Sequence, residues 1–287
     1  MRRSISNSAA SLLLLFSLLG HSPLAAEGPA VIDDSALKRD FVKKLSALLD
    51  EGKATPAAEL IAELKKQKSG AIDLGKSGED PSTVIDSSPY AAALPSTLLF
   101  GHLYKCNKCN KWHGSNAGGV VIGKDGIAVT NYHVIDSEKA AAFGAMDSRG
   151  NLFPVLKVLA SSEKDDLAIV QLGDCDLPPV SLATTANPGD AVHLLSHPDG
   201  HFFSYTRGVV SRYYLLGKKR AERMQITADF ARGSSGCGVF TSAGKLTGLV
   251  ASTNSIYYKQ KDGEDENLQM VIKTCVPVAR IKALINP

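Results

Sequence analysis

The sequence has no large excess of charge of either sign. It contains 32 basic residues (Lys and Arg) and 29 acidic ones, which leaves a formal net charge of +3 over 287 residues. Proteins that hold nucleic acid or anionic membrane through a basic face need a larger surplus. The short basic runs at 65–68 and 218–220 are typical of solvated surface. We therefore expect no nucleic-acid partner.

Long hydrophobic runs are also missing beyond the N-terminus. There, two arginines precede the apolar run 12–19, and residues 23–26 offer a small-residue cleavage site. This order is typical of a signal peptide, and the run is too short to span a bilayer comfortably. We predict a signal peptide at 1–26, with a retained anchor as the weaker alternative. No cysteine follows the run, which argues against a lipoprotein anchor.

Cleavage there would remove two arginines and no acidic residue, lowering the formal net charge from +3 to +1. The mature protein would then be secreted or periplasmic, with no stable membrane insertion. Its five cysteines would enter an oxidising compartment, where disulfides form. Because five is an odd number, at least one thiol stays free or pairs between chains.

Two of the cysteines, Cys106 and Cys109, precede His113 closely and resemble half of a zinc site. A closed structural zinc site needs four ligands, and the chain has no second cysteine pair of this spacing. A redox pair of this spacing normally heads a helix in a thioredoxin-like fold, which is not predicted here. We favour a local disulfide between Cys106 and Cys109, keep metal binding as the alternative, and assign no metal ligand.

Two amphipathic helices are predicted ahead of residue 70. Residues 34–51 place apolar side chains three and four positions apart, namely Leu37, Phe41, Leu45, Leu48 and Leu49. Thr55 and Pro56 read as the start of a second helix that continues toward Ser69. We predict a helical hairpin at 27–69. A docked extension is its default role, with a pro-segment and an interaction element as alternatives.

Residues 70–89 are rich in Gly, Ser, Asp and Pro and are predicted to be a linker. The remaining segment, 90–287, contains many short apolar stretches separated by turn residues. Lys124-Asp125-Gly126 between two such stretches predicts a hairpin. This pattern of short apolar stretches separated by turns favours an all-β barrel or sandwich over a parallel α/β sheet.

Three local patterns in this segment carry residues with catalytic chemistry. His133 follows an apolar stretch, Asp165-Asp166 begins another, and Ser234-Ser235 lies in the glycine-rich run 233–238. A serine hydroxyl needs a neighbouring base to become a nucleophile, and imidazole has a suitable pKa near neutrality. A carboxylate orients that imidazole and stabilises its charged form. Glycines let backbone N–H groups converge on a developing oxyanion.

These segments resemble those of trypsin-like serine proteases, and most closely the HtrA/Deg branch. The shared patterns are Thr-Asn-x-His-Val at 130–134, Asp-Leu-Ala-Ile-Val at 166–170 and Gly-x-Ser-Gly at 233–236. The resemblance covers roughly residues 98–255. It implies two packed antiparallel β-barrels of the chymotrypsin type at 90–287. Only 52 residues follow Ser235, so we expect no PDZ domain.

The resemblance also implies roles for individual residues. His133 is the general base and Asp166 its orienter; Asp166 is preferred to Asp165 because it directly precedes the Leu-Ala pair. Ser235 is the nucleophile, preferred to Ser234 because it precedes the glycine of the motif.

The oxyanion hole would be formed by the N–H groups of Gly233 and Ser235, with Ser234 lining the same turn. Asp229, six residues before the nucleophile, is a candidate for the base of the specificity pocket and would favour Lys or Arg. A different loop register, with Asp229 in ordinary turn hydrogen bonds, is at least as well supported. Cys237 departs from the family pattern, where many relatives have glycine, but is small enough for the turn.

Three further histidines gather in one stretch of the sequence. His193, His197 and His201 could line a cleft, but strand or loop positions explain them equally well.

The function predicted from these residues is an exported serine endopeptidase. It would act on polypeptide substrates through an acyl-enzyme and need no cofactor. The alternative is a catalytically silent protein that keeps the protease fold for binding or scaffolding.

Overall fold

The computed structural model describes residues 31–66, 69–75, 88–261 and 264–286. The signal peptide predicted at 1–26 lies outside the described residues, as does the greater part of the predicted linker. From Ile32 onward the chain forms one compact unit. Within the described residues, no helix is both long and apolar enough to cross a membrane.

The expected N-terminal helices are α1 (Asp34–Asp50) and α2 (Ala57–Lys66). α1 begins where the side chain of Asp33 accepts a hydrogen bond from the N–H of Ala36 at 2.8 Å. It ends before Gly52, whose φ of +68° suits the residue after a helix. The predicted apolar stripe of α1 is buried at its centre, at Leu37, Phe41 and Leu45.

Seven antiparallel strands form the first sheet. They are β1 (Thr97–Lys105), β2 (Trp112–Gly114), β3 (Ala117–Gly123), β4 (Ile127–Thr130), β5 (Ala142–Met146), β6 (Leu152–Ser162) and β7 (Leu167–Leu172). Their order is β2-β1-β3-β4-β7-β6-β5, and β1 also pairs with β5, which curls the sheet back on itself. The predicted hairpin joins β3 to β4 at Asp125 and Gly126, which both have positive φ.

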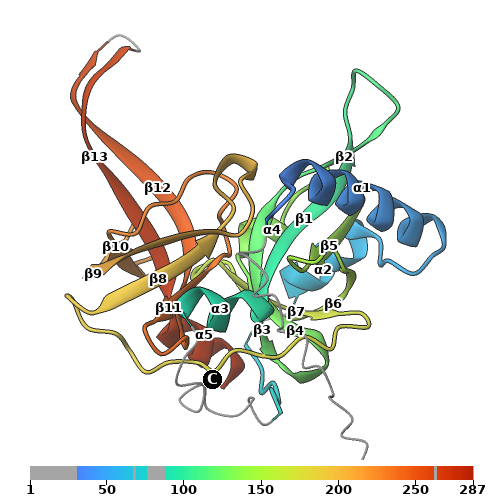
Figure 1. Cartoon of the computed structure of the whole chain (residues 1–287), viewed down its shortest axis with the longest axis horizontal. Helices are drawn as coiled ribbons and strands as arrows, with labels where there is room; N and C mark the ends of the chain where they lie inside the picture. Colours follow the sequence, from blue (N-terminus) through green and yellow to red (C-terminus); the bar gives the residue numbers. More distant parts are fainter. Residues whose placement is uncertain (1–30, 67–68, 76–87, 262–263, 287) are drawn as a thin grey trace, which may run out of the picture. The chain divides into compact units, whose positions relative to one another are not determined.

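The two helices pack against this sheet (Figure 1). Phe41 of α1 shares a buried cluster with Leu99 and Leu103 of β1. Leu60 of α2 shares another with Val158 of β6. We call the first sheet with α1 and α2 the first lobe.

Six strands close into an antiparallel barrel, which we call the second lobe. They are β8 (Ala191–Ser196), β9 (Ser204–Leu216), β10 (Ala221–Ile226), β11 (Gly238–Thr241), β12 (Leu246–Lys261) and β13 (Glu264–Pro277), in the order β10-β13-β12-β11-β8-β9. β12 and β13 continue past the barrel as a long two-stranded arm (Figure 1). The predicted all-β antiparallel class is confirmed.

The two lobes share a hydrophobic core. Val120 and Val129 of the first lobe belong to one buried cluster with Leu195 and Leu249 of the second. Ile281 joins this cluster from α5 (Val278–Ile285), the last helix of the described chain. α3 (Pro89–Ala93) leads into β1. Because both lobes bury apolar side chains in the same cluster, their loops are held against each other.

Candidate active site

A histidine and a carboxylate meet in the first lobe. His133 lies in the short helix α4 (Tyr132–Ile135), which follows β4. Its Nδ1 lies 2.9 Å from Oδ2 and 3.0 Å from Oδ1 of Asp166, and its backbone N–H donates to Oδ1 at 3.1 Å. With Nδ1–H donating to the carboxylate, Nε2 keeps the lone pair that can accept a proton. The His133 side chain is 50% exposed, so the ring is open to a substrate.

Asp166 is fixed by its own backbone as well as by the histidine. It has a left-handed conformation, with a φ of +60°, immediately before β7. The side-chain amide of Asn131 donates to its backbone oxygen at 3.0 Å. A left-handed residue with a side chain is energetically unfavourable and persists only where its surroundings hold it. Asn131 therefore positions the turn that presents the carboxylate.

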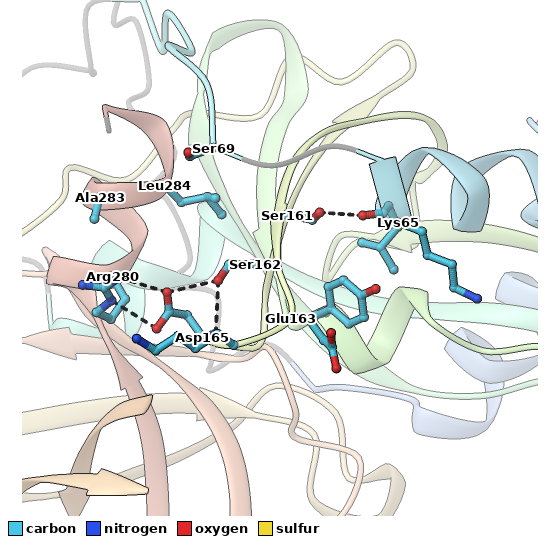
Figure 2. Close-up of a pocket in the computed structure, with 12 residues that line it drawn as sticks. Lys65, Ser69, Ser161, Ser162, Glu163, Asp165, Arg280, Ala283 and Leu284 are labelled. Atoms are coloured by element: carbon cyan, nitrogen blue, oxygen red, sulfur yellow. Dashed lines mark hydrogen bonds and ion pairs between the residues drawn. The ribbon is translucent and has the colours of Figure 1, made fainter. Parts of the chain in front are cut away.

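The neighbouring Asp165 points to a different partner. Its carboxylate receives hydrogen bonds from Arg280 of α5, at 3.0 and 3.2 Å, and from the hydroxyl of Ser162 at 3.1 Å (Figure 2). These residues line a cavity of about 460 Å³ between α2, the β6–β7 turn and α5. Of the two consecutive carboxylates, Asp166 is the one that contacts His133.

The predicted nucleophile lies on a glycine-rich turn of the second lobe. Ser235 precedes β11, and the glycines on either side of the serine pair, Gly233 and Gly236, have φ of +89° and +84°. The Ser235 hydroxyl donates to the backbone oxygen of Ala251 at 3.4 Å. Within the described residues it makes no hydrogen bond to His133. In enzymes without substrate the serine–histidine contact is often longer than a hydrogen bond and shortens when substrate binds.

Some backbone N–H groups of this turn donate to protein acceptors and others do not. The N–H of Ser234 donates to Ala231, and that of Gly236 donates to Val250 at 2.9 Å. Across the described part of the chain, the N–H groups of Gly233 and Ser235 find no acceptor. Two N–H donors without a protein acceptor on one turn are suited to an incoming oxyanion.

The first lobe holds the turn in place through β3. The N–H of Gly118 donates to the backbone oxygen of Ser235 at 2.7 Å, and the Thr130 hydroxyl donates to the oxygen of Gly118 at 2.8 Å. A side chain at position 118 would overlap the sulfur of Cys237. The absence of a side chain at Gly118 therefore leaves the space that the Cys237 sulfur occupies.

A buried histidine makes a further connection between the lobes. His197 accepts a hydrogen bond from the N–H of Phe203 at Nδ1, so its Nε2–H donates to the backbone oxygen of Leu98 on β1, at 3.0 Å. Burial lowers the pKa of His197 to about 4, and the ring is neutral near pH 7. The sequence does not distinguish His197 from the neighbouring His193 and His201.

The other two histidines and Asp229 lie at the surface. The Asp229 side chain is 86% exposed, and its carboxylate lies 3.4 Å from the ammonium group of Lys273. His193 on β8 forms a 2.6 Å hydrogen bond with the hydroxyl of Tyr205, and His201 is exposed. The role of Asp229 in specificity stays a prediction, and its exposed ion pair favours the alternative of a different loop register.

The five cysteines are thiols in the described structure. Cys175, Cys237 and Cys275 are buried, and burial raises the pKa of each. Cys106 and Cys109 lie near the surface with their sulfur atoms 3.4 Å apart. The local disulfide favoured from the sequence stays a prediction.

Comparison with known proteins finds similarity to serine proteases. Residues 117–249 match the family model of the trypsin-like peptidase domain, and this segment includes His133, Asp166 and Ser235. Serine endoprotease DegS of Haemophilus influenzae is 30% identical over 147 residues, covering 48% of this chain and 41% of the relative.

Two other relatives extend the match. A DegP-like periplasmic serine endoprotease of Hahella chejuensis is 26% identical over 194 residues, covering 66% of this chain and 40% of that protein. Protease Do-like 5 of Arabidopsis thaliana chloroplasts is 29% identical over 180 residues, covering 57% and 55%. The chain thus spans about two fifths of the length of the first two relatives. Residues 117–249 are thus similar to a trypsin-like peptidase domain, and the chain is similar over part of its length to the DegP-like and DegS serine endoproteases.

Proposed function

We propose that this protein is an exported serine endopeptidase that cleaves polypeptides through an acyl-enzyme. The observation that carries the proposal is the His133–Asp166 hydrogen bond in one lobe, combined with a serine turn in the other. Among the described residues, the N–H groups of Gly233 and Ser235 on that turn have no acceptor. Each part has another explanation when taken alone. Together they supply a base, its orienter, a nucleophile and an oxyanion site.

The first half of the reaction forms the acyl-enzyme. The Ser235 oxygen attacks the carbonyl carbon of the scissile bond while Nε2 of His133 takes its proton. Asp166 keeps the imidazole in the reactive tautomer and stabilises the imidazolium that results. The substrate oxygen, now negatively charged, accepts hydrogen bonds from the N–H groups of Gly233 and Ser235.

Collapse of that intermediate breaks the C–N bond, and His133 gives its proton to the leaving amine. Water then attacks the ester, again with His133 as base, and the serine is restored. The mechanism uses side chains and backbone alone and calls for no cofactor. Substrates are polypeptides, as the names of the related endoproteases suggest for those proteins.

Location outside the cytoplasm forms part of the proposal. The sequence of 1–26 has the order of a signal peptide, and a related protein is named as periplasmic. N-terminal sequencing of the protein after secretion from a bacterial host would test this. A mature N-terminus close to residue 27 is expected, and an uncleaved chain would contradict it.

The activity is tested by intact-mass analysis after exposure to a fluorophosphonate probe. Wild type is expected to gain one adduct, and Ser235→Ala none, because the probe reacts with an activated serine. Circular dichroism of both proteins establishes that the variant is folded.

A catalytically silent binding protein is the second candidate. The hydrogen bond from the Ser235 hydroxyl to Ala251, in place of one to His133, favours it. Folded wild type that takes up no adduct and cleaves no unfolded protein substrate would decide for this candidate.

A further inference from the structure

A second cluster of reactive side chains lies at the tip of the β1–β2 hairpin, in the first lobe. Cys106, Cys109 and His113 place one potential ligand atom each within 4.8 Å of one another. The Cys106 and Cys109 sulfur atoms are 3.4 Å apart, and the Cys109 sulfur is 3.1 Å from Nε2 of His113. The catalytic proposal uses none of these groups.

The hairpin holds two of the three ligands at fixed positions. β1 ends at Lys105, directly before Cys106, and Lys105 pairs with Trp112 across the hairpin. The next pair is Tyr104 and His113, whose rings stack with centroids 5.4 Å apart. Stacking on a strand neighbour restricts the imidazole to one orientation. The His113 ring is therefore directed by the sheet itself.

The loop that carries the two cysteines contains no helix. Residues 106–111 form turns, bends and irregular backbone between β1 and β2. A redox pair heading a helix, as in thioredoxin-like folds, is therefore a poor description of it.

The donor atoms select the class of metal. Two sulfurs and one imidazole nitrogen are the ligands of zinc and other soft or borderline ions. Residues 105–113 contain three lysines and no carboxylate, whereas calcium and magnesium sites in proteins rely on carboxylate ligands. Two thiolates balance the charge of one divalent ion, which leaves a neutral site among those lysines.

The distances also fit a tetrahedral ion. Zinc bound at its usual lengths separates neighbouring sulfur and nitrogen ligands by about 3.5–3.8 Å. The separations of 3.4 and 3.1 Å need only small movements of exposed side chains to reach those values. Three protein ligands leave a fourth position for water, as in zinc sites with two cysteines and one histidine.

We propose that Cys106, Cys109 and His113 bind one zinc ion at the tip of the β1–β2 hairpin, with water as the fourth ligand. This site is separate from the peptidase function and does not depend on it. The ion would fasten the loop 106–111 to the end of β2. It would also replace the local disulfide favoured from the sequence, because both sulfurs would be occupied.

Metal binding can be measured directly on the full-length mature protein. After reduction, chelator treatment and removal of any affinity tag, the protein is titrated with zinc in competition with a chromophoric chelator. One equivalent is expected to bind. Titration with Co²⁺ should give the visible bands of a tetrahedral ion and a thiolate charge-transfer band, which report sulfur ligation in wild type.

Substitutions identify the ligands. Cys109→Ser and His113→Asn should each weaken zinc binding by more than about 100-fold, because even changes beyond the direct ligands typically cost 10–100-fold. His201→Asn is the matched control, since His201 is an exposed histidine distant in the chain, and should bind like wild type. Circular dichroism checks that each variant is folded.

Two results would overturn the proposal. One is a reduced, folded wild type that binds no stoichiometric zinc or gives Co²⁺ spectra without a thiolate band. The other is binding that survives Cys109→Ser and His113→Asn unchanged. Intact mass adds a third test: isolation of a Cys106–Cys109 disulfide that persists when zinc and reductant are supplied would also contradict the site.

Discussion

The two lobes contribute different kinds of parts to the candidate active site. The first lobe holds His133 and Asp166 already joined by hydrogen bonds, so its part is complete without the other lobe. The second lobe presents Ser235 on a glycine-rich turn, and the Ser235 hydroxyl donates to the backbone oxygen of Ala251 on β12 of the same lobe. The comparison teaches that the proposed base and its orienter are assembled within one lobe, whereas the proposed nucleophile comes from the other lobe and depends on the packing of the two.

A small number of polar contacts controls that packing near the site. The N–H of Gly118 in the first lobe fixes the oxygen of Ser235 in the second, at 2.7 Å. The ring of His197 in the second lobe donates to Leu98 in the first. A substitution can therefore disrupt the His133–Asp166 pair of the first lobe, the Ser235 turn of the second lobe, or the contact between the lobes. These three kinds of damage should have distinguishable effects on activity and stability.

The largest effect is expected from removing the reactive group of either lobe. His133→Ala and Ser235→Ala should each lower kcat/KM on a protein substrate by a factor on the order of 10⁶, because base and nucleophile act as a unit. The double variant should lose little more than either single one. Steady-state kinetics of the three proteins measures this, and additive losses would show that the two lobes do not form one catalytic unit.

The next effect separates two adjacent carboxylates of the first lobe. Asp166→Asn should lower kcat/KM by a factor on the order of 10⁴, because the imidazole loses its orienting partner. Asp165→Asn should leave the chemistry intact but lower the free energy of unfolding by about 2 kcal/mol, since it breaks a half-buried pair with Arg280. Steady-state kinetics and urea unfolding of both variants measure kcat/KM and the free energy of unfolding. Equal losses of activity would contradict the assignment.

Much of the first lobe and of its contribution to the candidate site could be predicted from short-range sequence patterns. Lys124-Asp125-Gly126 supplies the positive φ values of a tight hairpin, so β3 and β4 are visible as a pair. The stripe of 34–51 predicts α1, and the motifs place His133 and Asp166 beside strands. These features depend on residues close together in the chain.

Other elements carry no such local signal. β10 (Ala221–Ile226) contains Glu, Arg and Gln among its six residues, and the distal half of β12 has polar side chains on both faces, so neither shows the alternation of a half-buried strand. His197 meets Leu98, a residue 99 positions away. The hydroxyl direction of Ser235 likewise depends on tertiary packing, which spacing alone does not report.

Replacing Gly236 by alanine adds a methyl group to the serine turn of the second lobe and tests the contact of this turn with the first lobe. Gly236 has a φ of +84°, and a Cβ there would overlap the backbone oxygen of Gly118. Gly200 has nearly the same φ, +87°, but open space around it. Gly200→Ala should lower the free energy of unfolding by about 1–2 kcal/mol, from backbone strain alone.

Gly236→Ala adds overpacking to that strain and should be about 1–3 kcal/mol less stable than Gly200→Ala. It should also slow fluorophosphonate labelling of Ser235, which Gly200→Ala should not. Urea unfolding and labelling rates measure both. Equal behaviour of the two variants would show that the close approach of Gly118 to the turn is not part of the site.

A pH effect should report the buried histidine that links the lobes. The pKa of His197 is about 4 in the folded protein and about 6.5 in the unfolded chain, so the unfolded state binds the proton first. Neutral His197 therefore contributes its full share to the free energy of unfolding above pH 6.5. This contribution, on the order of 3 kcal/mol, is lost as the pH falls toward 4.

Urea unfolding of wild type and His197→Gln from pH 4.5 to 7.5 isolates this contribution. The variant should be less stable at pH 7, because the ring no longer bonds to Leu98 and Phe203. Its stability should nevertheless fall less steeply with acidification. Parallel curves for the two proteins would mean that the histidine does not set the acid limit.

The smallest effect is expected from the serine beside the nucleophile, which belongs to the same turn of the second lobe. The Ser234 hydroxyl is buried and, among the described residues, has no hydrogen-bond partner, whereas Ser235 is only half-buried. Deleting a hydroxyl that makes no bond leaves no partner unsatisfied, so Ser234→Ala should change stability by less than about 1 kcal/mol and kcat/KM by only a few-fold. Fluorophosphonate labelling should persist in Ser234→Ala and vanish in Ser235→Ala. The opposite pattern would assign the nucleophile to Ser234, whose hydroxyl is buried within the lobe and closed to a substrate until the turn moves.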